Sequence, residues 1–127
     1  MSRYKCQNFA STFRNARKGM RLTIKSERNI RVHFFVAVLV LISAYCLNFS
    51  ITKFCIIIIA IAAVISAEMM NSAIEFSLDA IFHNRYSRMV GMAKDIAAGA
   101  VMVVTISAVM VGVLLFAPPI IYLIINH

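Results

Sequence analysis

Three long apolar stretches constrain this chain more than any other feature of its sequence. They cover residues 32–49, 54–82 and 96–117. A helix needs ~20 mostly apolar residues to cross the hydrocarbon core of a bilayer. We therefore predict an all-α membrane protein with three transmembrane helices, built as a single domain over 1–127. Prolines disrupt helices, so we expect Pro118 and Pro119 to end the third span.

The overall composition also requires a membrane. Of the 127 residues, 61% are hydrophobic and 14% are charged. A soluble domain of this length buries too small a fraction of its surface to hide so much apolar area. Lipid therefore has to act as the solvent for part of the chain. Three spans make a thin monomer, so we also expect an oligomer with closely packed helices.

The segment before the first apolar stretch has the pattern of a basic amphipathic helix, which we place at residues 7–27. Its apolar residues recur at spacings of three or four, and basic residues fill other positions around them. The apolar positions are Phe9, Phe13, Ala16, Met20 and Ile24. Helices of this kind lie in the membrane interface. The alternative is a helix packed on a soluble core, but no such core follows in the sequence.

The distribution of basic residues predicts the orientation of the chain. Nine of the thirteen Lys and Arg residues precede Val32, three more lie between Arg85 and Lys94, and Lys53 stands alone. Because basic residues prefer the cytoplasmic side, we expect the N-terminus and the 80–95 loop to face the cytoplasm. The chain would then be a multi-pass protein of the bacterial cytoplasmic (inner) membrane. We interpret the net charge of +8 as topology and attraction to anionic lipid, and expect no nucleic-acid partner.

Cysteine and histidine show no pattern typical of a site. The chain contains Cys6, Cys46, Cys55, His33, His83 and His127. The cysteines are odd in number and form no CxxC pair, which argues against a disulfide framework. The histidines are too far apart for zinc-ligand spacing. We interpret all six residues as structural or incidental.

Acidic residues are rare and fall on the predicted cytoplasmic side. They are Glu27, Glu68, Glu75, Asp79 and Asp95. Three of them share one face of the second span with Asn71, because positions 68, 71, 75 and 79 are three or four residues apart. Ionisable groups within membrane segments are costly and by default indicate function. The alternative is a polar seam that holds helices together.

These residue types suit metal and phosphate chemistry. Carboxylates at the membrane interface are good ligands for Mg²⁺, and Lys94 could supply positive charge to a polyphosphate. The chain has no Walker A loop and no kinase glycine loop, so ATP does not follow from spacing alone. The residues themselves indicate an intramembrane carboxylate site that binds metal and opens to the cytosol.

Three segments resemble the prokaryotic diacylglycerol kinase family, which includes the Gram-positive undecaprenol kinases. The strings are ERNIRVH (27–33), AEMMNSAIE (67–75) and AKDIAAGAV (93–101). The resemblance extends from residue 9 to residue 117. It implies a homotrimer with composite sites and an N-terminal surface helix. It also implies an enzyme, a lipid kinase that uses ATP as co-substrate and Mg²⁺ as cofactor.

The resemblance also implies roles for individual residues. Glu68 matches the general base and contacts the lipid substrate, and Asn71 stands beside it as a second catalytic residue. Glu27 and Glu75 match the Mg²⁺ ligands and so belong to the nucleotide site as well. The remaining nucleotide contacts correspond to Arg85, Tyr86, Ser87, Lys94 and Asp95. Within that set, the lysine would lie near the phosphates and the aspartate near the adenine.

The identity of the lipid substrate rests on one segment. The ERNIRVH string is closer to the undecaprenol kinases than to the Gram-negative diacylglycerol enzyme, so we favour undecaprenol over diacylglycerol. Two other classes compete with a kinase. A small proton-coupled transporter would need a carboxylate reached from both sides, whereas all the acids here cluster on one side. A non-enzymatic scaffold or holin-like protein would leave these polar residues without a role.

Overall fold

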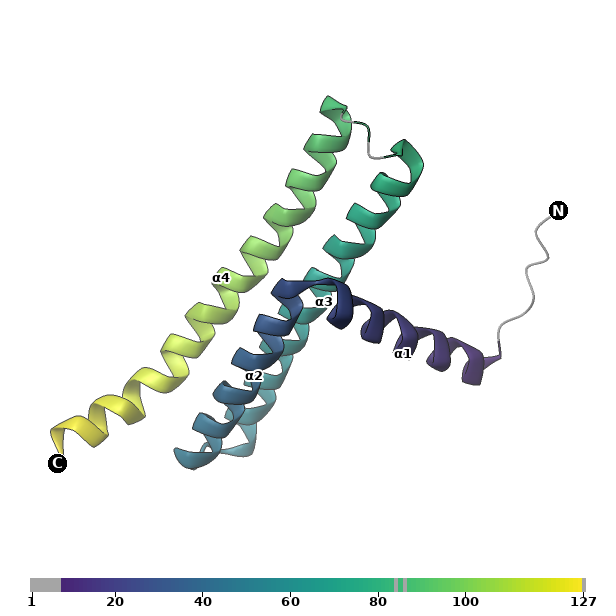
Figure 1. Ribbon diagram of the computed structural model, residues 1–127. Coiled ribbons are helices and arrows are strands. Elements are labelled where there is room, and N and C mark those ends of the chain that lie inside the picture. Colours follow the sequence, from purple (N-terminus) through teal and green to yellow (C-terminus); the bar gives the residue numbers. More distant parts are fainter. Residues whose placement is uncertain (1–7, 84, 86, 127) are drawn as a thin grey trace.

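The computed structural model describes residues 8–83, 85 and 87–126, and in this part of the chain it contains four helices. The helices are α1 (Phe9–Ser26), α2 (Arg28–Cys46), α3 (Ile51–Phe82) and α4 (Arg88–Ile125). In Figure 1, α2 and α4 both run along α3, while α1 projects to one side. The predicted all-helical fold is therefore confirmed for the residues that the structure describes.

Helices α2, α3 and α4 are each long and apolar enough to cross a membrane. α3 has 32 residues and α4 has 38, which correspond to ~48 Å and ~57 Å at a rise of 1.5 Å per residue. Both exceed the ~30 Å hydrocarbon core of a bilayer. Each helix is therefore long enough to extend out of the hydrocarbon core. The extra turns can carry polar residues near the end of the bundle where the α3–α4 connection lies.

The buried apolar residues follow a seven-residue repeat on each of the three long helices. They are Ile30, Ala37 and Ala44 on α2, Ile57 and Val64 on α3, and Val90 and Ala97 on α4. Residues seven positions apart lie on one face of a helix, as in a coiled-coil seam. Small residues in such a seam let helix backbones approach closely, which is how membrane helices pack. This seam determines which side chains of α2 meet those of α3.

The corner between α1 and α2 lies at Glu27. Its backbone is extended, with φ −103° and ψ 121°, so it ends one helix and begins the next. The Arg31 guanidinium donates hydrogen bonds of 3.1 Å to the carbonyls of Ile24 and Lys25. These carbonyls belong to the last turn of α1, which has no following helical N–H groups to pair with. One arginine of α2 therefore fixes the end of α1.

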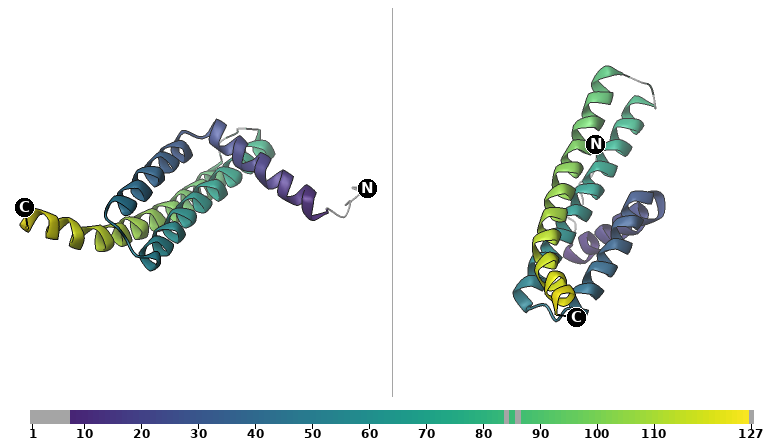
Figure 2. Two further views of the ribbon diagram at one scale, coloured as in Figure 1. Left: turned by 90° about the horizontal axis from the view of Figure 1, so that it is seen from below. Right: turned by 90° about the vertical axis from the view of Figure 1, so that its left-hand side faces the viewer.

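The third span differs most from the expectation, because Pro118 and Pro119 lie inside α4 and do not end it. The helix runs on to Ile125, so residues 120–125 are helical as well. Two prolines remove only two helical N–H donors, and continuing the helix keeps the remaining backbone groups paired in apolar surroundings. The C-terminal part of α4 bends away from the rest of the helix in Figure 2, which is the usual effect of an internal proline.

The ends of the other spans shift by a few residues. α2 covers Arg28–Cys46 where the sequence suggested 32–49, because Asn48 adopts a left-handed conformation with φ 51° and turns the chain. α3 begins at Ile51 and ends at Phe82, where the range 54–82 was expected. In the turn, the Phe49 ring lies 4.8 Å from the Phe116 ring, centroid to centroid. This contact ties the α2–α3 turn to α4.

Candidate active site

Polar side chains occupy the α3 face expected from the sequence. Glu68 and Ser72 are buried, and the Ser72 hydroxyl donates a hydrogen bond of 3.0 Å to the Glu68 carbonyl. Asn71, Glu75 and Asp79 are half-buried on the same helix. Their spacing of three or four residues places them one above another along the helix. α3 thus carries a row of polar groups from the packed interior toward its C-terminal end.

Glu68 meets a histidine from the neighbouring helix. His33 Nε2 lies 3.1 Å from Glu68 Oε1, and the two side chains are 26% and 9% exposed. His33 lies between the buried residues Ile30 and Ala37, so the packing of α2 turns it toward α3. An ionised carboxylate can only accept hydrogen bonds, so the imidazole Nε2 is assigned the donor role. The histidine therefore holds one oxygen of a buried carboxylate.

Asn71 makes a different contact from the one expected. Its side-chain Nδ2 donates a hydrogen bond of 2.9 Å to Glu75 Oε1, one turn further along α3. Its Oδ1 is buried and has no hydrogen-bond partner among the described residues. A buried oxygen without a partner costs free energy unless a ligand, water or ion satisfies it. Asn71 and Glu75 together therefore present oxygen atoms that fit a hard cation such as Mg²⁺.

Glu68, Asn71 and Glu75 share a pocket of about 380 Å³ with residues of α2 and α4. The other lining residues are Asn29, His33, Ala98, Val101, Met102, Thr105 and Ile106. The polar groups come from α2 and α3, while α4 contributes a mainly apolar wall. The pocket is large enough for a small polar group to approach Glu68 and Glu75 together.

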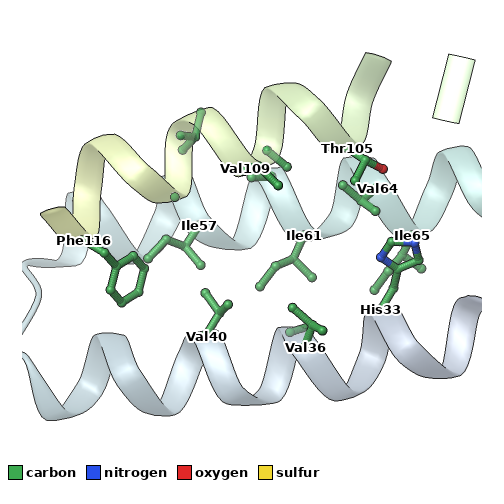
Figure 3. A pocket seen from close by; sticks show the side chains of 15 residues that line it. His33, Val36, Val40, Ile57, Ile61, Val64, Ile65, Thr105, Val109 and Phe116 are labelled. Carbon is green, nitrogen blue, oxygen red and sulfur yellow. The ribbon is translucent and has the colours of Figure 1, made fainter. Parts of the chain in front are cut away.

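An apolar groove of about 220 Å³ begins where this pocket ends. His33 and Thr105 line both, so the two spaces meet at the level of Glu68. Figure 3 shows His33 and Thr105 toward one end of the groove and Phe116 at the other, with aliphatic side chains between them. Thr105 Oγ1 is buried without a hydrogen-bond partner in the described part of the chain. The junction therefore combines polar groups with the start of a hydrocarbon-lined path.

Lys94 forms an ion pair that the sequence did not indicate. Its Nζ lies 2.6 Å from Asp79 Oδ1, joining α4 to α3. The side chains are 34% and 39% exposed, so both charges remain partly in contact with solvent. The pair lies near the 83–87 connection, beyond Glu75 along α3. It gives Asp79 a partner and holds the lysine near the end of the polar row.

The remaining candidate residues do not line this pocket. Glu27 is half-buried at the α1–α2 corner, and Asp95 is exposed on α4. Arg85 is exposed in the α3–α4 connection, and Ser87 precedes the first residue of α4. Tyr86 lies outside the described residues. In the part of the chain that the structure describes, no three His, Cys, Asp or Glu side chains gather closely enough to hold a metal ion alone.

His33 is the candidate residue that the sequence analysis missed, because its sequence pattern indicates a structural or incidental residue and does not predict its contact with Glu68. A usable signal was present, since His33 is an ionisable residue near the start of a predicted membrane span. The cost of burying an ionisable group, which marks the carboxylates, marks this histidine as well. The partner on α3 could not be identified because residues 33 and 68 come together only through helix packing.

Comparisons with known proteins agree with the resemblance noted in the sequence. The family model described as prokaryotic diacylglycerol kinase matches residues 14–116. Undecaprenol kinase of Bacillus subtilis is 34% identical over 116 residues, covering 91% of this chain and 94% of that protein. Diacylglycerol kinase of Synechocystis sp. is 32% identical over 118 residues, covering 93% of this chain and 67% of that protein. The chain belongs to the prokaryotic diacylglycerol kinase family and is a lipid kinase.

Proposed function

We propose that the protein transfers the γ-phosphate of ATP to the hydroxyl of a membrane lipid in a Mg²⁺-dependent reaction. The favoured acceptor is undecaprenol, giving undecaprenyl phosphate, and the alternative is diacylglycerol, giving phosphatidic acid. The observation that carries the proposal is the position of Glu68, a buried carboxylate at the junction of the polar pocket and the apolar groove. A lipid hydroxyl meets a polar pocket at such a junction while its chain stays in hydrocarbon.

Glu68 is proposed as the general base and as the contact for the lipid hydroxyl. An alcohol is a poor nucleophile, and a base within hydrogen-bond reach removes its proton as the new bond forms. The contact with His33 leaves Glu68 Oε2 as the oxygen free to face the acceptor. Asn71 lies in the same pocket and is proposed as a second catalytic residue that orients the base or the substrate.

Glu75 and Glu27 are proposed as the Mg²⁺ ligands. Mg²⁺ is usually held by one or two carboxylates together with substrate phosphates, so a cluster of three protein ligands is not required. Bound Mg²⁺ would neutralise the charge of the β- and γ-phosphates, which is a large part of what phosphoryl transfer needs. Asn71 Oδ1, buried beside Glu75, is a further oxygen that fits this site.

The nucleotide is proposed to approach from the end of α3 and α4 where the connection 83–87 lies. Lys94 would bind the phosphates and Asp95 the adenine, and Arg85, Tyr86 and Ser87 would add contacts. Support comes from Lys94, which the Asp79 carboxylate holds in place across the two helices. A lysine there can exchange or share its partner when a polyphosphate arrives, because the pair is partly exposed.

The choice of undecaprenol draws on the chain's own sequence. The two relatives named above act on different lipids by name, and their identities of 34% and 32% do not separate the alternatives. The ERNIRVH segment resembles the undecaprenol kinases, and it contains both Glu27 and His33. The second of these residues lines the junction at which the acceptor would bind.

The assembly and orientation are also proposals. We infer a homotrimer, as the family resemblance implies, with sites shared between protomers. We place the protein in the bacterial inner membrane with the N-terminus in the cytoplasm, because most basic residues precede Val32. α1 would then lie on the cytoplasmic surface of the membrane, with Phe9 and Phe13, both exposed here, facing the lipid.

The test is transfer of labelled phosphate from [γ-³²P]ATP to lipid by purified protein in mixed micelles, with and without Mg²⁺. We expect Mg²⁺-dependent labelling of undecaprenol, slower labelling of diacylglycerol, and loss of both in Glu75→Ala. Ser77→Ala is the matched control, because Ser77 is exposed on α3 and its hydroxyl bonds within its own helix. Equal rates with the two lipids would refute the preference for undecaprenol, and no transfer by folded protein would refute the kinase assignment.

A further inference from the structure

The apolar groove extends from the candidate base toward the opposite end of the helix bundle. Between Thr105 and Phe116 it follows α4 for ~16 Å at the helical rise per residue. That is about half the ~30 Å thickness of a bilayer core. Apolar cavities of about 150 Å³ stay dry and take up small hydrocarbons, so a groove of about 220 Å³ suits a hydrocarbon chain.

Gly112 keeps the middle of this groove open. It lines the groove, and a Cβ atom built on it would meet no atom within 4 Å apart from its own helix backbone. No described glycine has a positive φ, so the backbone at this position does not require glycine. Because residue 112 has no side chain, the groove has open space at this position. Gly99 on the same helix also has open space around it but does not line the groove.

We propose that this groove binds the hydrocarbon chain of a single-chain acceptor alcohol and so presents its terminal hydroxyl to Glu68. The inference rests on the proposed function and adds the acceptor's shape and its binding site. One narrow groove holds one chain, so it would take the part of an isoprenoid alcohol nearest the hydroxyl, and the rest of a long prenol would extend into the lipid. This groove would hold only one of the two chains of a diacylglycerol.

Two features of the groove favour a lipid chain over a second copy of the protein as the occupant. The groove is continuous with the Glu68 pocket through His33 and Thr105. The Thr105 hydroxyl is buried at the junction without a partner in the described residues. An alcohol oxygen could satisfy it, whereas a hydrocarbon side chain could not.

Binding of the acceptor's hydrocarbon chain in the groove would orient the acceptor more than it would increase its affinity. The surrounding lipid is as apolar as the groove, so there is no hydrophobic gain on entering it. The groove instead aligns the chain so that the hydroxyl stops at the level of Glu68, which lowers the entropic cost of reaching the base. A side chain added at residue 112 would therefore affect the transfer rate for long acceptors most strongly.

The test compares Gly112→Leu with Gly99→Leu on a series of prenols of increasing length in mixed micelles. We expect Gly112→Leu to lower kcat/KM for long prenols by roughly 10-fold or more, since a misfit of one or a few methylenes in a tight site has that effect. The shortest prenol should react at an unchanged rate, and Gly99→Leu should match the wild type throughout. Full activity of folded Gly112→Leu on long prenols, an equal loss on all lengths, or faster wild-type transfer to diacylglycerol would overturn the inference.

A binding measurement separates this inference from the kinase assignment. A prenol with a photoreactive group at mid-chain should label the wild-type protein on α4 between Val109 and Phe116, and Gly112→Leu should lose that label. If Gly112→Leu does not fold, labelling of the wild-type protein on α4 between Val109 and Phe116 is sufficient to support the groove assignment. Labelling of the outer helix faces alone, or a change in oligomer size with no label, would overturn the groove assignment. If no prenol receives phosphate yet α4 is labelled, the proposed choice of a prenol as acceptor fails, while the assignment of the groove as a binding site for a hydrocarbon chain stands.

Discussion

His33 of α2 and Glu68 of α3 meet across the helix interface, with 3.1 Å between the imidazole Nε2 and the carboxylate Oε1. The contact lies at the point where a polar pocket joins an apolar groove. A carboxylate held by a neighbour keeps one orientation, which an unsupported side chain would not. In the proposed mechanism, this pair sets the position at which the lipid hydroxyl is activated.

Substitution of His33 should reduce catalysis without abolishing lipid binding. His33→Leu removes the donor to Glu68, and we expect kcat to fall roughly 10- to 100-fold, the effect of a misplaced catalytic group. His33→Gln can place an N–H near the position of Nε2 and should recover most of the rate. Steady-state kinetics of both variants provide the measurement, with Ser43→Ala on the exposed side of α2 as the control.

A double-variant comparison shows whether His33 acts through Glu68. If it does, His33→Leu should have little further effect in a Glu68→Gln background, because coupled residues give non-additive effects. Independent losses that multiply would contradict the coupling, as would a leucine variant with wild-type kcat.

Asn71 should affect the Mg²⁺ requirement. Its side-chain amide donates a hydrogen bond to Glu75, and its Oδ1 is buried without a partner in the described residues. Asn71→Ala therefore removes the group that orients Glu75 and an oxygen that could bind the metal ion. We expect the Mg²⁺ concentration for half-maximal activity to rise roughly 10-fold or more, the usual scale for loss of a supporting group at a metal site. A Mg²⁺ titration at saturating ATP measures it, and an unchanged titration curve would exclude Asn71 from the metal site.

The Lys94–Asp79 pair should matter for nucleotide binding more than for stability. Both side chains are more than a third exposed, and pairs of this kind contribute about 0–1 kcal/mol to folding. Lys94→Ala should therefore raise the KM for ATP several-fold with little change in thermal stability. Asp79→Asn should have a smaller effect on that KM. A large stability loss in Lys94→Ala with normal ATP kinetics would assign the pair a purely structural role.

Local pattern was enough to predict the helices and the polar face of α3. A 3.6-residue repeat places residues 68, 71, 75 and 79 on one face wherever the helix packs. The continuation of α4 past Pro118 and Pro119 could not be predicted from local helix preference. It depends on keeping the backbone N–H and C=O groups paired in apolar surroundings. The bounds of α4 therefore required the structure.

The contacts between helices were the other part that sequence alone could not supply. His33 and Glu68 are 35 residues apart, and Lys94 and Asp79 are 15 apart. Both pairs depend on the rotation of each helix about its own axis. That rotation is set by the seven-residue seam of buried side chains, such as Ala37 on α2 and Val64 on α3. The seam was visible only once burial was known.

Single-turnover phosphate transfer from ATP to undecaprenol by Glu68→Gln tests most directly whether Glu68 activates the lipid hydroxyl. The glutamine keeps the size of the side chain but cannot take a proton. We expect the rate of the chemical step to fall roughly 10²- to 10⁴-fold, the usual contribution of a general base, while ATP binding stays unchanged. Transfer at the wild-type rate by folded Glu68→Gln would contradict the account.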